Sequence, residues 1–254
     1  MRNCLLTILL MSAFSLQAAP VGNRTPYSHH FSEGHGGWFS GRQFALKIWD
    51  GAAQCYSPWF VDPNHAPPGA GYLHLVMWIY TARHWYQPDM PAAARLPYQE
   101  SSFADQGKST DLRDARLTVR LRGQVELKGA KLLLLAQAQT PKTTTNFILT
   151  AQPIEITEDW SDQTIVLAND PKQWTCIGSR QDLSDLYGCD DLNTALSDVN
   201  VDLIFVLFPL DVEPACPGVT DPHGLKAGVD YPVNTAKLPR GLIQFESVKL
   251  EYPQ

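Results

Sequence analysis

The chain has 254 residues, with 20 Lys and Arg against 26 Asp and Glu, which gives a net charge of −6 at pH 7. Acidic and basic residues are scattered along the chain, which argues against a nucleic-acid partner or an anionic membrane surface. All-β domains often use about 200–250 residues as one unit, so the length indicates a single domain.

Residues 1–19 have the pattern of a secretory signal peptide, with a positive charge at Arg2, an apolar run and two alanines at the end. Removing Arg2 leaves 20 − 1 = 19 basic residues against 26 acidic ones, a net charge of −7. No later stretch approaches the ~18 consecutive apolar residues of a membrane span. We therefore expect one secreted or periplasmic domain over residues 20–254, with no membrane insertion.

Nine later segments have the apolar and β-branched composition of strands. In chain order they are residues 44–49, 72–80, 115–122, 131–139, 146–150, 154–157, 163–167, 201–208 and 242–251. Within 117–122 and 243–251 apolar and polar residues alternate, as in strands with one face in water. Residues 132–135 are four consecutive leucines, which is consistent with a strand covered on both faces, the alternative being a short buried helix.

Helical pattern is confined to two short segments, 182–187 and 191–196, each of which opens with an acidic residue suited to a helix start. Many strands with turn-rich links and little helix predict an all-β fold, a two-sheet antiparallel β-sandwich. Two connections, 81–112 and 211–240, exceed the ~12–15 residues of ordinary loops, and such loops are usually functional or disordered. We expect both to be ordered.

Four cysteines remain after the signal peptide: Cys55, Cys176, Cys189 and Cys216. An even number in an exported chain favours two disulfides, and three pairings are possible. Cys176 and Cys189 flank a short segment rich in Asp, Ser and Gly, so we predict that they pair with each other. That leaves a second disulfide between Cys55 and Cys216. No CxxC spacing supports zinc instead.

The best candidates for a ligand platform are Trp85 and Tyr86, which lie in a proline-bounded loop beside Arg83. An exposed aromatic ring stacks on the apolar face of a sugar, while nearby polar groups bond its hydroxyls. The segment before residue 72 is stiffened by prolines, and its residues Asn64 and His65 would form a second edge of the same ligand platform. The alternatives are that the aromatic side chains belong to the core and that this segment only leads into a strand.

The sequence contains two other groups of candidate site residues, three N-terminal histidines and a set of carboxylates. His29, His30 and His35 would bind a transition metal if their imidazoles converged, or they belong to a wet strand edge followed by a glycine-rich turn. Short motifs of hydrolases, zinc proteases and nucleotide-binding proteins are absent from the sequence. A polysaccharide-active enzyme needs only paired carboxylates roughly 5–9 Å apart. The grouping that would supply them is Asp89, Glu100, Asp105 and Asp111.

Several loosely spaced motifs resemble the galactose-binding-like jelly-roll superfamily, which includes bacterial carbohydrate-binding modules and the laminin IV type domain. They are Phe31-Ser-Glu-Gly with Gly37-Trp38, Gly69-Ala-Gly-Tyr-Leu, Leu112-Arg-Asp-Ala-Arg-Leu-Thr-Val-Arg-Leu-Arg-Gly, Lys131-Leu-Leu-Leu-Leu, Ile156-Thr-Glu-Asp-Trp160 and Gly241-Leu-Ile-Gln-Phe-Glu-Ser-Val-Lys-Leu. The resemblance implies a jelly-roll β-sandwich. It also implies a structural calcium ion between Glu33 and Glu246, whose oxygens suit that metal.

The sequence and this resemblance together favour a secreted, non-catalytic binding module that recognises carbohydrate or another cell-surface ligand. A polysaccharide-active enzyme is one alternative. The other is an envelope or matrix protein-interaction domain without a glycan ligand, for which an exposed apolar patch of several hundred Å² would be the sign.

Overall fold

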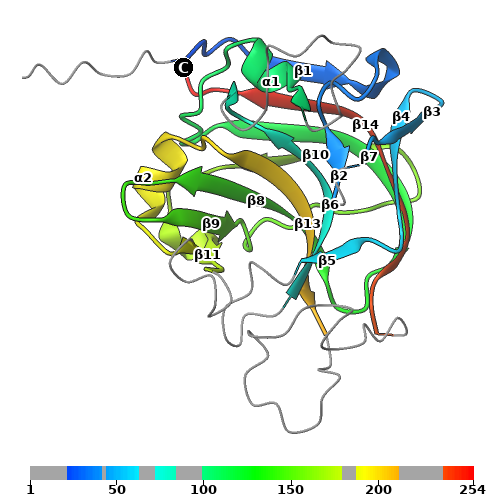
Figure 1. The fold of residues 1–254 in the computed structure, drawn as a ribbon. Coiled ribbons are helices and arrows are strands. Elements are labelled where there is room, and N and C mark those ends of the chain that lie inside the picture. Colours follow the sequence, from blue (N-terminus) through cyan, green and yellow to red (C-terminus); the bar gives the residue numbers. More distant parts are fainter. Residues whose placement is uncertain (1–21, 42–43, 63–71, 84–98, 179–186, 212–236) are drawn as a thin grey trace, which may run out of the picture.

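A computed structural model describes residues 22–41, 44–62, 72–83, 99–178, 187–211 and 237–254. These residues form two β-sheets packed face to face, with a few short helices (Figure 1). The predicted all-β sandwich is therefore confirmed. The signal-peptide segment, and the central parts of both long connections, lie outside the described residues.

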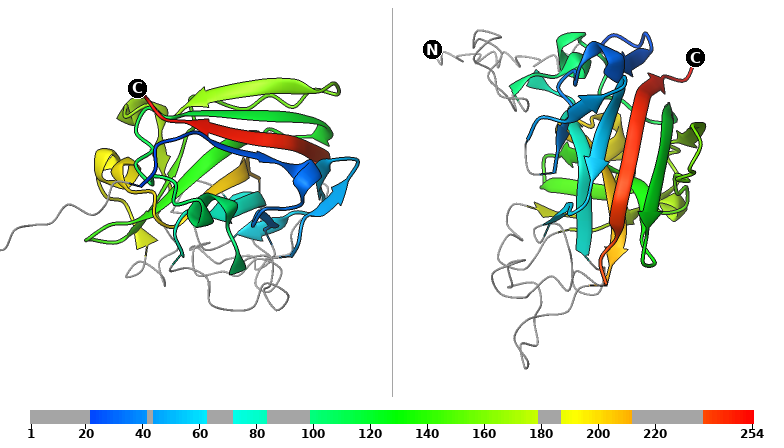
Figure 2. Two further views of the ribbon diagram at one scale, coloured as in Figure 1. Left: turned by 90° about the horizontal axis from the view of Figure 1, so that it is seen from above. Right: turned by 90° about the vertical axis from the view of Figure 1, so that its right-hand side faces the viewer.

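The first sheet has six strands and is built around the long strand β14. Its order is β10 (Ser161–Val166), β7 (Arg116–Glu126), β14 (Arg240–Glu251), β4 (Ala52–Tyr56) and β3 (Lys47–Trp49), with β1 (Tyr27–His30) also paired to β14. All of these pairs are antiparallel. In the right-hand view of Figure 2, β14 (red) runs the height of the sandwich between β7 (green) and the blue N-terminal strands.

The second sheet has eight strands, with β13 at its centre. Its order is β11 (Thr175–Cys176), β9 (Thr144–Ile148), β8 (Lys131–Gln139), β13 (Asp202–Leu210), β6 (Tyr72–Tyr80) and β2 (Phe39–Ser40), with β5 (Phe60–Asp62) beside β6 and β12 (Tyr187–Gly188) beside β9. The β12–β9 pair is parallel and the other pairs of this sheet are antiparallel.

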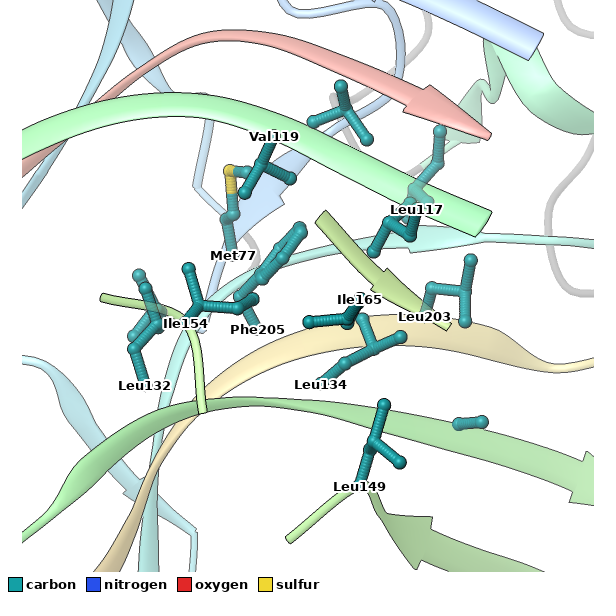
Figure 3. Close-up of a cluster of buried hydrophobic side chains, with 14 of the residues drawn as sticks. Met77, Leu117, Val119, Leu132, Leu134, Leu149, Ile154, Ile165, Leu203 and Phe205 are labelled. Atoms are coloured by element: carbon teal, nitrogen blue, oxygen red, sulfur yellow. The ribbon is translucent and has the colours of Figure 1, made fainter. Parts of the chain in front are cut away.

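The core between the sheets is formed by the inward face of each strand (Figure 3). On β7, Leu117, Val119 and Leu121 are buried, whereas Thr118 and Arg120 between them face outward. The alternation seen in the sequence is therefore the alternation of the pleat. Burying these side chains supplies the main favourable free energy of folding.

The eight-stranded sheet is buried on both faces, as the four consecutive leucines predicted. Leu132 and Leu134 face the core between the sheets, and Leu133 and Leu135 belong to a second apolar cluster on the opposite face. All four are at most 1% exposed. The second cluster also contains alternate residues of β13 and β6, such as Ile204, together with Ile148 of β9 and Ile177.

The element predictions hold for the long strands and fail for some short ones. Strands β6 and β8 have the predicted bounds. Residues 154–157 form no strand, because Ile154 makes one isolated bridge, to Leu132. Tyr187 begins β12 rather than ending a helix, and the rest of 182–187 lies outside the described residues.

Short helices mark two of the connections. Helix α2 (Leu192–Ser197) agrees with the prediction, and the side chain of Asp191 caps it by accepting a hydrogen bond from the Thr194 backbone. Helix α1 (Ser102–Asp105) in the first long connection was not predicted; Ser101 is its N-cap. Within the described part of the chain, every helix falls short of the length and apolar character needed to cross a membrane.

One of the two predicted disulfides is present. Cys176 and Cys189 are bonded, and the bond joins the ends of β11 and β12, which lie in succession along the edge of β9. Cys55 on β4 instead carries a free thiol whose side chain is buried in the core. The predicted Cys55–Cys216 bond is therefore not formed in this structure; Cys216 itself lies outside the described residues.

The disulfide gives the first prediction. Because it closes a loop between cysteines 13 residues apart, reducing it should lower the free energy of unfolding by about 3 kcal/mol. Urea unfolding with and without dithiothreitol measures this. The variant Cys176→Ser/Cys189→Ser should show the same loss and no further response to the reductant. A further response would show that Cys55 is also bonded, contrary to the structure.

Candidate functional site

Four of the five predicted ligand-binding residues, Asn64, His65, Trp85 and Tyr86, lie outside the described residues. The fifth, Arg83, is more than half exposed, and its guanidinium pairs with the Asp105 carboxylate at 3.3 Å. This ion pair holds Arg83 against helix α1. Of the predicted ligand platform the structure describes Arg83 alone, so the platform stays a prediction.

The three N-terminal histidines do not converge on one point. His29 and His30 are neighbours on β1, so their side chains face opposite sides of the sheet, one buried and one exposed. The buried His29 ring lies 3.0 Å from the Gly34 carbonyl oxygen, and burial lowers its pKa. His35 accepts a hydrogen bond from the Gly37 backbone. Of the two alternatives for these histidines, the structure therefore has the strand followed by a glycine-rich turn and not the converging imidazoles of a metal site.

The carboxylates considered for catalysis are each engaged by a different side chain. Glu100 lies 3.2 Å from the His35 ring, Asp105 pairs with Arg83, and Asp111 accepts two hydrogen bonds of 2.8 Å from Arg113. Arg113 lowers the pKa of Asp111. Asp89, the fourth member of the group, lies outside the described residues.

The residues suggested for calcium do not form an open oxygen site. Glu33 is exposed in the short helix η1 (Phe31–Glu33), and the Glu246 carboxylate pairs with the guanidinium of Arg120. Across the described ranges, no group of three or more His, Cys, Asp or Glu side chains is placed to hold a metal ion. A cation at Glu246 would have to compete with Arg120, so the arrangement does not favour calcium, which stays a prediction.

A different part of the surface has the features of a binding site. Among the described residues, the large apolar side chains that stand exposed are Phe44, Trp49 and Tyr56, at 66%, 68% and 59%. All three lie in residues 44–56, here called the aromatic hairpin, which projects at the upper right of Figure 1 as β3 and β4. Single exposed apolar residues are common, so the occurrence of three exposed rings within one hairpin makes this surface a candidate binding site.

The sequence contains a strong signal for this hairpin that our strand assignment missed. Trp49 pairs directly with Ala52, so Asp50 and Gly51 form a two-residue turn. Both have positive φ, 50° and 73°, as in the tight turns that suit the twist of paired strands. An Asp-Gly pair between two apolar segments predicts such a turn, and it would have located β4.

Beside the hairpin lies a hollow of about 170 Å³, here called the edge hollow. It forms where the chain crosses from β2 in one sheet to β3 in the other, so both sheets contribute to it. Its lining includes Ser40, Phe44, Lys47, Gln54, Tyr56 and Trp59. This volume is below the 300–1,000 Å³ usual for a whole small ligand, so it suits one group of a larger ligand.

Two buried residues in the lining have contrasting chemistry. The indole N–H of Trp59 is buried and finds no hydrogen-bond acceptor in the described part of the chain. Leaving such a donor unpaired costs about 1–3 kcal/mol, so an acceptor at this point would be stabilised. Burial raises the pKa of the Cys55 thiol to about 12, so Cys55 stays protonated and is a poor nucleophile.

Behind Trp59 lies His74, a buried histidine of β6 whose ring centre is 5.9 Å from that of Trp59. Burial lowers the pKa of His74 to about 4. The imidazole is therefore neutral at pH 7, and protonating it would place a charge inside the fold beside the edge hollow.

His74 gives a pH prediction. In the unfolded chain its pKa is about 6.5, so between about pH 6.5 and pH 4 the unfolded state binds more protons and stability falls as the pH falls. The contribution of His74 should amount to about 2 kcal/mol between pH 7 and pH 5. Urea unfolding of the wild type and of His74→Leu at both pH values measures it. An equal pH dependence in both proteins would contradict it.

Comparison with known proteins adds little to this geometry. No protein-family model matches the chain, and no curated protein matches it either. Among solved structures, the chain is similar to the L4b domain of human laminin α-2, with a TM-score of 0.27 and 10% identity. The match covers 57% of this chain and 62% of that one. A score this low indicates no more than a loose relation between two β-sandwiches.

Proposed function

We propose that this protein is an extracellular, non-catalytic binding module that recognises carbohydrate through its aromatic hairpin. The observation that carries the proposal is the gathering of Phe44, Trp49 and Tyr56 on one hairpin beside the edge hollow. Folding alone gives no reason for these rings to stand in water, because the core is filled by other residues.

The chemistry of the hairpin suits a sugar. Lys47, Trp49, Gln54 and Tyr56 share the outward face of β3 and β4, because Lys47 pairs with Gln54 and the others lie two residues away along each strand. An aromatic face packs against the C–H groups of a sugar ring, while ammonium and amide groups hydrogen-bond its hydroxyls. The face therefore combines both kinds of contact that a sugar needs.

The edge hollow adds a third contact. A ring stacked on Tyr56 would lie at the mouth of this hollow, whose lining includes Ser40 and Gln54. Its small volume suits one sugar substituent or one terminal residue. The proposal thus assigns recognition to the β3–β4 edge of the sandwich.

The Cys176–Cys189 disulfide supports the proposed extracellular location, since such bonds persist in oxidising environments. The signal-peptide pattern of residues 1–19 points the same way. A non-catalytic role is supported by the contact of Glu100 with the His35 ring, by the ion pairs of Asp105 and Asp111, and by the raised pKa of Cys55.

The test replaces the exposed rings one at a time. Tyr56→Ala and Trp49→Ala should each weaken binding to the best ligand of a glycan array by about tenfold, or about 1.4 kcal/mol. Because both rings are exposed, the free energy of unfolding should change by less than about 0.5 kcal/mol. Isothermal titration and urea unfolding measure the two quantities.

The matched control is Lys172→Ala, an exposed residue of the short helix η5 (Pro171–Gln173) beside the other sheet, which should leave both quantities unchanged. A large loss of stability in Tyr56→Ala would show that the ring is structural. If no glycan binds the folded wild type, the proposal is wrong, and the aromatic hairpin becomes a candidate surface for a protein partner instead.

A further inference from the structure

A row of polar side chains crosses the outward face of the six-stranded sheet. Lys47 on β3 pairs with Gln54 on β4, Gln54 with Gln244 on β14, and Gln244 with Arg122 on β7. These four residues, here called the outer-face row, lie side by side because antiparallel pairing sets them in register. Three strand spacings of ~4.8 Å make the row about 14 Å long, more than one sugar ring.

Hydrogen bonds fix the planar groups of this row. The Gln244 amide donates to the Gln54 side-chain oxygen at 2.8 Å, and Nε of Arg122 donates to the Gln244 side-chain oxygen at 2.7 Å. The Gln54 amide in turn donates to the Trp49 and Ala52 carbonyl oxygens. Each planar group is therefore held in one orientation before any ligand arrives, which lowers the entropy cost of binding.

An aromatic ring and a cation meet at each end of the row. At one end the Arg122 guanidinium lies over the Trp160 ring, 4.6 Å from its centre. At the other end the Lys47 ammonium lies 5.9 Å from the centre of the Trp49 ring. Stacking on Trp160, together with the Nε hydrogen bond, orients the guanidinium plane.

The charge of the row is positive and uncompensated. Within the described residues, no carboxylate forms an ion pair with Lys47 or Arg122. Two other arginines of the same sheet are paired, Arg120 with Glu246 and Asp162 and Arg240 with Glu126, whereas Arg116 at the far end of β7 has no ion pair among the described residues either. In a chain with a net charge of −6, two cations that lie in one ordered row and have no carboxylate partner in the described ranges mark a surface suited to an anion.

Arg122 has the geometry for that role. Only its Nε is engaged, so its two terminal nitrogens have no hydrogen-bond partner among the described residues. Paired guanidinium N–H groups match a carboxylate or sulfate group in a two-point contact that a lysine ammonium does not reproduce. The side chain is half-buried, which strengthens such a contact compared with full exposure.

We infer that the outer-face row binds a linear oligosaccharide carrying carboxylate or sulfate groups, with Arg122 taking one anionic group and Lys47 another. The inference rests on the proposed function and narrows its ligand to an acidic glycan chain longer than one sugar. Trp160 and the aromatic hairpin flank the chain. Its hydroxyls bond to the positions that the row itself does not use, namely the second amide N–H of Gln244 and the second lone pair of each glutamine oxygen.

The test compares three hexasaccharides: galacturonic acid oligomer, a sulfated chondroitin-type oligomer and neutral cellohexaose. Isothermal titration against the full mature protein should show binding of at least one acidic hexamer, weakened tenfold or more between 50 and 300 mM NaCl. Cellohexaose should bind at least tenfold more weakly than that hexamer. The acidic hexamer that is preferred identifies the anionic group as carboxylate or sulfate.

Variants of the row sharpen the test. Arg122→Gln should weaken binding of the acidic hexamer at least tenfold and leave binding of cellohexaose unchanged. Arg122→Lys keeps the charge but not the planar fork, so it should retain the salt dependence with several-fold weaker binding. Arg240→Gln is the matched control, since that arginine is already paired with Glu126 and should not affect binding. Urea unfolding of each variant shows whether it is folded.

The outcomes separate this inference from the proposed function. If cellohexaose binds as tightly as the acidic hexamers and Arg122→Gln changes nothing, the inference is overturned, whereas a loss in Tyr56→Ala still supports carbohydrate binding. If none of the three hexamers and no glycan of a wider array binds the folded protein, both proposals fail.

Discussion

The constraint on which both the core and the outer surface depend is a bulge in β14 at Glu246. Before it, Ile243 and Phe245 face the core; after it, Val248 and Leu250 do. The register with β7 shifts by one residue between Phe245 and Ser247. Without this extra residue, one half of the strand would turn its apolar side chains to water. The reason is that a register shift of one residue moves every side chain to the opposite face of the sheet.

The same bulge divides the edge of β14 between two partners. Strand β4 pairs with residues 242–245 and β1 with residues 247–250. The aromatic hairpin is therefore anchored to the half of β14 that carries Gln244. The bulge itself places Glu246 beside Arg120, which neutralises that arginine, whereas the neighbouring Arg122 has no carboxylate partner among the described residues. Packing inside the sandwich and charge on its outer face are thus set by one local feature.

The sequence was enough to predict elements whose signal is local. The four leucines of β8 and the flanking cysteines of the 176–189 disulfide were assigned correctly, because each signal lies within a few residues of its consequence. The outer-face row was not predictable in this way. Gln54 and Gln244 are 190 residues apart, and Gln244 and Arg122 are 122 apart. Only the register of the folded sheet brings their side chains together.

The aromatic hairpin also shows how an exposed edge is kept from aggregating. Strand β3 is an outer strand of its sheet, with unpaired backbone groups that could pair with another chain. It has only three residues and carries Lys47, and short length and a lysine both discourage such pairing. Trp49 on the same strand works against that protection, because an exposed indole ring favours association. The edge is otherwise protected, yet it keeps exposed rings at positions 44, 49 and 56, and this combination is what the proposed ligand at the hairpin would account for.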